Sequence, residues 1–330
     1  MSEPADQSAA GRLARAADRL QQRLPWLAFP VAVGKKFSED QAANLAALVA
    51  YFAFVSVFPL LLVLTTILEL TLRGDSALRH RLLTSALASF PVVGTQLRGS
   101  THPLGETGIA LAIGLIGAFL GGRGVAGAAQ NALNWAWMVP FNRRPRFPWN
   151  ELRNLAFVAV VGLGQIATSL LSGAIGGTGH VLSDAGARIG ATVVALALNV
   201  IVFWAGFRLV TASMVTCRQL WLGGLAAATA WQALQLTGGI IVSRTVAASS
   251  SLYGTVGIVL GLLAWLYLQA QITLLAIEID VVRARGLWPR SLRPPLTPQD
   301  VTAYRLYARA EQRRRGIDIE VADTDVTGRA

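Results

Sequence analysis

Four polar residues stand out because they lie within or directly after long apolar stretches: Arg123, Asn134, Gln271 and Glu278. A charged side chain inside a membrane is costly, so it is a functional hypothesis by default. Arg123 could pair with a carboxylate, hold an anionic lipid headgroup or extend to the membrane surface. Glu278 could line a polar pathway, or it could lie at the cytoplasmic end of its span, where it would pair with Arg283 or face lipid headgroups. The sequence leaves these alternatives open.

The sequence offers no set of residues for catalysis or metal binding. Its three histidines are far apart, and Cys217 is its single cysteine. Metal-dependent RNA cleavage needs clustered histidines and carboxylates, whereas the carboxylates near the apolar stretches are scattered. No GxxxxGK[ST] motif is present, so ATP hydrolysis by this chain is not expected to drive transport. We therefore predict no enzyme activity, no catalytic residue, no metal and no cofactor.

The composition indicates a membrane protein. The chain has 330 residues, of which 53% are hydrophobic and 14% charged, and its mean hydropathy is +0.50. A soluble domain is typically about a quarter charged. These values argue against a soluble globular enzyme and against an intrinsically disordered chain.

Six stretches are long and apolar enough to cross a bilayer, which takes about 20 residues. They cover approximately residues 45–70, 107–122 (with an extension up to 129), 155–175, 189–210, 220–242 and 252–282. We predict an all-α polytopic membrane protein, a bundle of six transmembrane helices with short amphipathic helices. The expected parts are a cytoplasmic segment with an amphipathic helix (1–42), the transmembrane domain (43–283) and a partly disordered basic tail (284–330).

The distribution of basic residues predicts the orientation. Most of the 29 lysines and arginines lie in the two terminal segments and in the connections between the second and third and the fourth and fifth stretches. The positive-inside rule therefore places both termini in the cytoplasm. The net charge of +11 then reflects topology, and membrane lipids, not nucleic acid, are the expected partners. Residues 9–24 are either an amphipathic helix on the inner leaflet or a polar tail.

Small residues predict where helices pack closely. Gly117 and Gly121 in the second stretch recur at helical spacing, and so do Gly254, Gly257 and Gly261 in the sixth. Such faces let a neighbouring backbone approach. Pro59 lies inside the first stretch. Because proline removes a backbone hydrogen bond, we expect a kink there.

Four blocks of the sequence resemble the YihY/virulence factor BrkB family of bacterial inner-membrane proteins, historically labelled ribonuclease BN. The blocks are Leu45–Leu64, Ala132–Val139, Gly223–Val242 and Tyr253–Asp280, within a similarity that runs from Phe37 to Arg283. The family typically ends the last block with a Gly-Ala-Glu-Leu-like run, whereas this chain has Ala-Ile-Glu-Ile around Glu278. The resemblance implies a multi-pass protein of the bacterial inner membrane with six helices and cytoplasmic termini. It also implies a link to envelope integrity and lipid traffic, and it supplies no catalytic residue.

Two functions of different classes remain. The bundle could transport an amphiphile such as a lipid between leaflets, with Arg123, Gln271 and Glu278 as candidate pathway residues. Alternatively, it could be a non-catalytic scaffold that binds envelope proteins through its tails and outer loop. An ion channel would need a selectivity filter, which the sequence does not show. Homo-oligomerisation is left open.

Overall fold

The computed structural model describes residues 18–71, 107–177, 185–212, 214–314 and 319. Within them, all regular secondary structure is helical, which confirms the all-α prediction. The long helices are α2 (Pro25–Glu39), α3 (Ala42–Thr71), α6 (Thr107–Ala136), α7 (Trp149–Gly177), α8 (Ala185–Val210), α9 (Trp221–Arg285) and α10 (Pro298–Ala310). Most of the predicted N-terminal amphipathic helix, the three histidines and most of the end of the basic tail lie outside the described residues.

Four helical segments in the described part of the chain are long and apolar enough to cross a membrane. They are Ala42–Val63, Leu111–Ala136, Thr192–Val210 and Val259–Arg285. These correspond to the first, second, fourth and sixth expected stretches, and they support a membrane protein. The third and fifth stretches, in α7 and in the first part of α9, are not among them, so the count of six is not confirmed.

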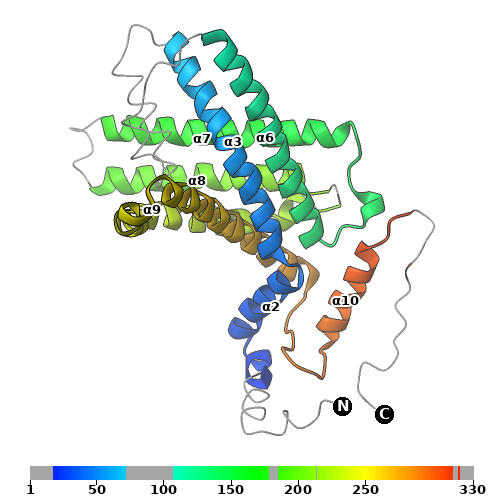
Figure 1. Ribbon diagram of the computed structural model, residues 1–330. Coiled ribbons are helices and arrows are strands. Elements are labelled where there is room, and N and C mark those ends of the chain that lie inside the picture. The colour runs from blue at the N-terminus through cyan, green and yellow to red at the C-terminus, as the bar shows by residue number, and fades with distance from the viewer. Residues whose placement is uncertain (1–17, 72–106, 178–184, 213, 315–318, 320–330) are drawn as a thin grey trace.

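Helix α9 folds back on itself. The backbone N–H of Gly223 donates to Asp280 Oδ1 at 2.8 Å, although the two residues are 57 positions apart in one helix. A straight helix would separate them by about 85 Å. Leu234 and Leu262 likewise share one buried apolar cluster. The fifth and sixth expected stretches are therefore two arms that run side by side, and the gold arm returns toward the start of α9 (Figure 1).

Helices α3 and α6 pack closely through the predicted glycines of α6. A Cβ at Gly117 would lie 2.7 Å from the Pro59 ring, and one at Gly121 would lie 2.4 Å from Ser56 Cβ. Glycine at these positions lets the two helices approach until backbone and side chain touch. Helix α3 continues past Pro59 to Thr71. The pair stands across α7 and α8 in the view of Figure 1.

The ends of several helices meet at one end of the molecule, which we call the basal end. It comprises α2, α10, the ends of α6, α8 and α9, and the connections 137–148, 211–220 and 286–297. Asn134 Oδ1 accepts from the backbone N–H of Ala212 at 3.1 Å, and Arg153 Nε donates to the carbonyl of Leu209 at 2.8 Å. The fully buried Trp137 lies in the apolar core of this end. The described parts of both terminal segments thus lie at the same end (Figure 1).

Candidate functional site

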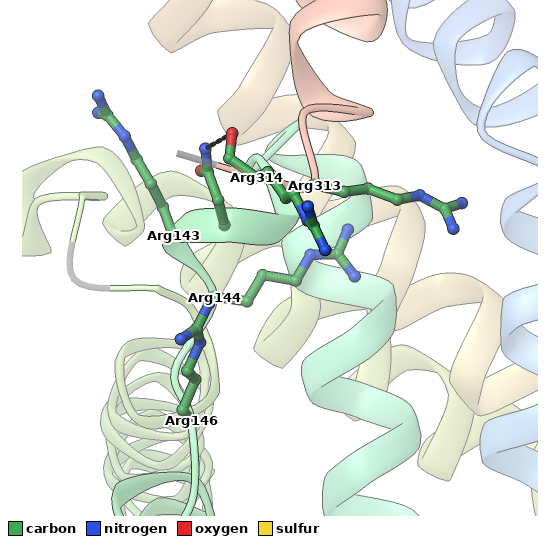
Figure 2. Close-up of a pocket in the computed structure, with 6 residues that line it drawn as sticks. Arg143, Arg144, Arg146, Arg313 and Arg314 are labelled. Carbon is green, nitrogen blue, oxygen red and sulfur yellow. Dashed lines mark hydrogen bonds between the residues drawn. The ribbon is translucent and has the colours of Figure 1, made fainter. Parts of the chain in front are cut away.

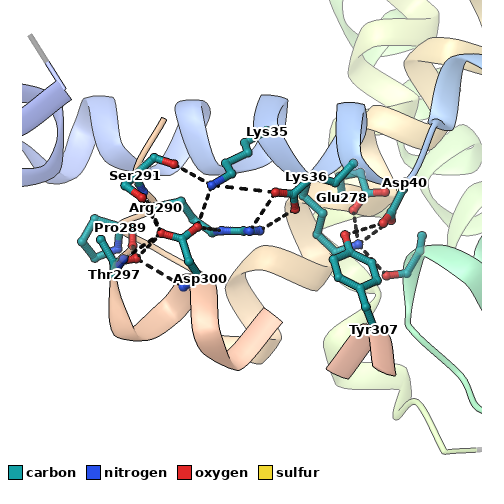
Figure 3. Close-up of polar contacts among 12 residues, drawn as sticks. Lys35, Lys36, Asp40, Glu278, Pro289, Arg290, Ser291, Thr297, Asp300 and Tyr307 are labelled. Carbon is teal, nitrogen blue, oxygen red and sulfur yellow. Dashed lines mark hydrogen bonds and ion pairs between the residues drawn. The ribbon is translucent and has the colours of Figure 1, made fainter. Parts of the chain in front are cut away.

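The basal end contains a buried ionic cluster centred on Lys36. Lys36 and Asp40 lie one helical turn apart, so both side chains point the same way. Lys36 Nζ lies 3.1 Å from Glu278 Oε2, contacts Asp40 Oδ2 and donates to the carbonyl of Ala136 at 2.9 Å. The Tyr307 hydroxyl donates to Asp40. The cluster, drawn in Figure 3, therefore joins α2, α6, α9 and α10.

Glu278 is thus held in an ion pair at the end of α9. Its side chain is 1% exposed, and that of Lys36 is completely buried. The sequence left open a pathway role, pairing with Arg283 and contact with lipid headgroups; the ion-pair partner in the structure is Lys36, which lies 242 positions earlier in the chain. This partner was missed because no local pattern connects two residues so far apart.

A second cluster surrounds Asp300 at the start of α10. Asp300 Oδ1 accepts from Lys35 Nζ and from Arg290 Nε, both at 2.7 Å, and Oδ2 accepts from the Ser291 hydroxyl at 2.8 Å. Arg290 also donates to Glu39 at 3.0 Å. The Asp300 and Arg290 side chains are fully buried (Figure 3). A capping box between Thr297 and Asp300 begins the helix, a pattern that the sequence Thr-Pro-Gln-Asp carries.

The environments of these clusters shift the pKa values of two groups. Burial alone would raise the pKa of Asp300, but hydrogen bonds from Lys35, Thr297, Ser291 and Arg290 hold it well below its usual range. Burial, together with the neighbouring Asp40 carboxylate, raises the pKa of the Tyr307 hydroxyl well above its usual value. Asp300 is therefore held as a carboxylate and Tyr307 as a neutral donor.

Arg123 forms an ion pair on an exposed flank of α6 and α7. Its Nε and Nη2 atoms donate to the two carboxylate oxygens of Glu151, each at 2.8 Å. The Arg123 side chain is 54% exposed and that of Glu151 is 28% exposed. Of the alternatives for Arg123, pairing with a carboxylate is the one seen in the structure.

The remaining candidate residues occupy different environments. Asn134 is buried, and its Oδ1 accepts a hydrogen bond from the backbone N–H of Ala212, so it links α6 to the segment after α8. Gln271 lies half-buried on α9, two turns before Glu278. The structure does not bring Arg123 and Glu278 into one site, since each is held by its own partner. Glycines 257 and 261 are half-buried on α9, and the surroundings of Gly254 lie outside the described side chains.

The described residues hold no group of three or more His, Cys, Asp or Glu side chains that could bind a metal ion. Cys217 is exposed in the short 3₁₀ helix Cys217–Gln219. The site that the structure describes is therefore made of ion pairs.

The helical fold and the candidate spans define the class: this is an all-α membrane protein. The family model for virulence factor BrkB matches residues 33–295, and the chain belongs to this family. The match includes Lys36, Arg123 and Glu278 and ends before Asp300 and Tyr307. No curated protein and no solved structure matches the chain.

Proposed function

We propose that the protein handles lipid in the bacterial inner membrane, moving an amphiphile between leaflets in support of the cell envelope. Both termini lie in the cytoplasm in this proposal. The observation that carries it is the exposed ion pair between Arg123 and Glu151. A transporter of amphiphiles needs a place where the polar headgroup of a lipid can leave water while the acyl chains stay in hydrocarbon. In this proposal, the ion pair supplies charged partners for the headgroup at such a place.

The pair lies among exposed apolar side chains. Phe119 and Leu120 of α6 and Leu152 of α7 are all more than half exposed. Arg123 lies within the candidate span Leu111–Ala136. A charge there is unfavourable if it faces hydrocarbon, so an ion pair at this position marks a polar pathway more often than a lipid-facing surface. A headgroup that carries both charges could exchange partners with Arg123 and Glu151, while its acyl chains lie along the apolar flank. In this proposal, Glu278 anchors the basal end and does not line the path.

The test is reconstitution of the pure protein into proteoliposomes that contain a fluorescent phospholipid, followed by measurement of its movement between leaflets. We expect protein-dependent movement, slowed about tenfold or more in the Arg123→Gln/Glu151→Gln double variant, since each 1.36 kcal/mol of barrier corresponds to a factor of about ten. Arg218→Gln, which removes an exposed arginine elsewhere, should leave the rate unchanged. A folded wild-type protein that moves no phospholipid would refute the proposal for this class of lipid.

The alternative is a membrane scaffold for envelope proteins. The buried Asp300 carboxylate favours it, because its ion pair with Lys35 holds α10 against α2 and so presents a defined surface outside the spans. A scaffold should capture stable partners in a pull-down, and the capture should depend on residues 290–330. Lipid movement without such partners would favour transport.

A further inference from the structure

A pocket of about 460 Å³ at the basal end is lined almost entirely by arginines (Figure 2). Its lining residues are Asn142, Arg143, Arg144, Arg146, Arg313 and Arg314. They come from the connection between α6 and α7 and from the segment after α10. Asn142 joins the two segments, since its backbone N–H donates to the Gln312 carbonyl at 3.1 Å and its Nδ2 donates to the Arg314 carbonyl at 3.4 Å.

The positive charge of the pocket is largely uncompensated within the described residues. The one ion pair among the lining arginines there joins Arg313 to Glu311, with 3.7 Å between nitrogen and oxygen and both side chains well exposed. Like charges gathered around one pocket repel one another. They also produce a positive potential that attracts anions. An anion in the pocket would relieve the repulsion, so the arrangement favours a negatively charged ligand.

Arg144 retains a free donor in this pocket. Its Nε donates to the Val139 carbonyl at 3.3 Å and its Nη1 to Asn131 Oδ1 at 3.1 Å. Its Nη2 is buried and has no hydrogen-bond partner in the part of the chain that the structure describes. The guanidinium carbon lies over the Phe141 ring, 4.0 Å from its centre. Because an unsatisfied buried donor is costly, a small shift of the Arg144 side chain that brought Nη2 to a ligand oxygen would be favoured.

Exposed aromatic residues follow the pocket in the chain. Phe147 is 82% exposed and Trp149 is 69% exposed, and such side chains concentrate where a membrane meets water. An anion bound here would therefore lie at the level of lipid headgroups. Guanidinium groups bind phosphate oxygens through paired hydrogen bonds, and basic pockets beside spans bind anionic headgroups.

We propose that the arginine pocket binds the phosphate group of an anionic lipid headgroup. The site is separate from the Arg123–Glu151 pair, and it would bind lipid whether or not the protein moves lipid between leaflets. Inorganic phosphate carries the same oxygens without acyl chains. The lipid is favoured because aromatic side chains that can lie among acyl chains adjoin the cationic residues.

The test is titration of the full-length protein in an uncharged detergent, by calorimetry, with three probes: short-chain phosphatidylglycerol, short-chain phosphatidylcholine and inorganic phosphate. The pocket variant is Arg146→Gln/Arg313→Gln/Arg314→Gln. All three of these side chains are exposed. The control replaces three exposed arginines outside the pocket, Arg23, Arg218 and Arg309, with glutamine.

We expect phosphatidylglycerol to bind about tenfold or more tightly than the other two probes. The pocket variant should lose about a hundredfold of this affinity, because each basic residue near an anionic headgroup contributes roughly fivefold. The control variant should bind as the wild type does, and wild-type affinity should fall at high salt.

Three results would overturn the proposal. Equal losses in the pocket and control variants would show a nonspecific effect of net charge. Inorganic phosphate that binds as tightly as phosphatidylglycerol would show a site for soluble anions. A single-stranded RNA that binds more tightly than the lipid, and depends on the same arginines, would show a nucleic-acid surface. Should the pocket variant fail to fold, the triple Arg→Lys variant keeps the charges but loses the guanidinium forks, and it must then bind phosphatidylglycerol more weakly than wild type.

Discussion

Replacing Lys36 with methionine should destabilise the basal end more than any other single change in its buried cluster. Lys36 is the cation that contacts both Asp40 and Glu278, and its side chain is completely buried. Methionine has a similar length but no charge, so the substitution leaves two carboxylates without their partner. Its effect therefore reports on the ionic contacts more than on packing.

The magnitude follows from the three partners of Lys36. Removing one member of a buried ion pair costs about 3–5 kcal/mol, because the other charge remains buried and unpaired. Glu278→Gln should cost less, about 1–2 kcal/mol, since Lys36 keeps its contacts with Asp40 and the Ala136 carbonyl. In the Lys36→Met/Glu278→Gln double variant, Glu278→Gln should reduce the free energy of unfolding by less than it does alone, with a coupling energy of about 1–3 kcal/mol.

Denaturant titration in mixed micelles, followed by circular dichroism, measures these differences. Limited proteolysis of the segment from residue 286 onward provides a local readout, because the cluster also holds α10 through Tyr307. Arg23→Met, an exposed position close to α2, is the control and should change stability by less than about 0.5 kcal/mol. A Lys36→Met protein as stable as this control would refute the reasoning that the cluster holds the basal end together.

Three further predictions concern packing and pH. Gly121→Ala should destabilise the α3–α6 pair by about 1–3 kcal/mol because its Cβ would overlap Ser56, whereas Gly127→Ala, with open space around it, should be neutral or stabilising in the same unfolding assay. Because the pKa of Asp300 is lowered on folding, its contribution to the stability of the folded protein is complete above its unfolded pKa of about 3.9 and is lost progressively as pH falls below it. Proteolysis of α10 should therefore increase at acid pH in the wild type, and Asp300→Asn should abolish this dependence on pH. Because the pKa of Tyr307 is raised on folding, its contribution to the stability of the folded protein is complete below its unfolded pKa of about 10 and is lost as pH rises further. Tyr307→Phe should remove this loss of stability at alkaline pH, measured by unfolding at a series of pH values.

Features that repeat along a single helix could be predicted from the sequence. Apolar stretches of span length predicted the helices, and the spacing of Gly117 and Gly121 predicted a close-packed face, because both patterns follow from the 3.6-residue period. The partner of that face could not be predicted. Any helix with a suitable groove could have packed there, and the structure shows that α3 does, through Pro59 and Ser56.

The basal clusters could not have been predicted from local patterns, for a physical reason that also bears on their role. Lys36 and Glu278, like Lys35 and Asp300, are more than 240 positions apart. Glu278 stood out in the sequence, but nothing in the sequence near it indicates that Lys36 is its partner. Their burial has a cost that only simultaneous pairing offsets, so the ion pairs can form only once α2, the end of α9 and α10 have met. The clusters therefore disfavour incorrect packing of these helices, because a misplaced helix would leave a buried charge unpaired. This makes them suited to holding the two terminal segments in one arrangement beside the spans, next to the arginine pocket that those same segments help to build.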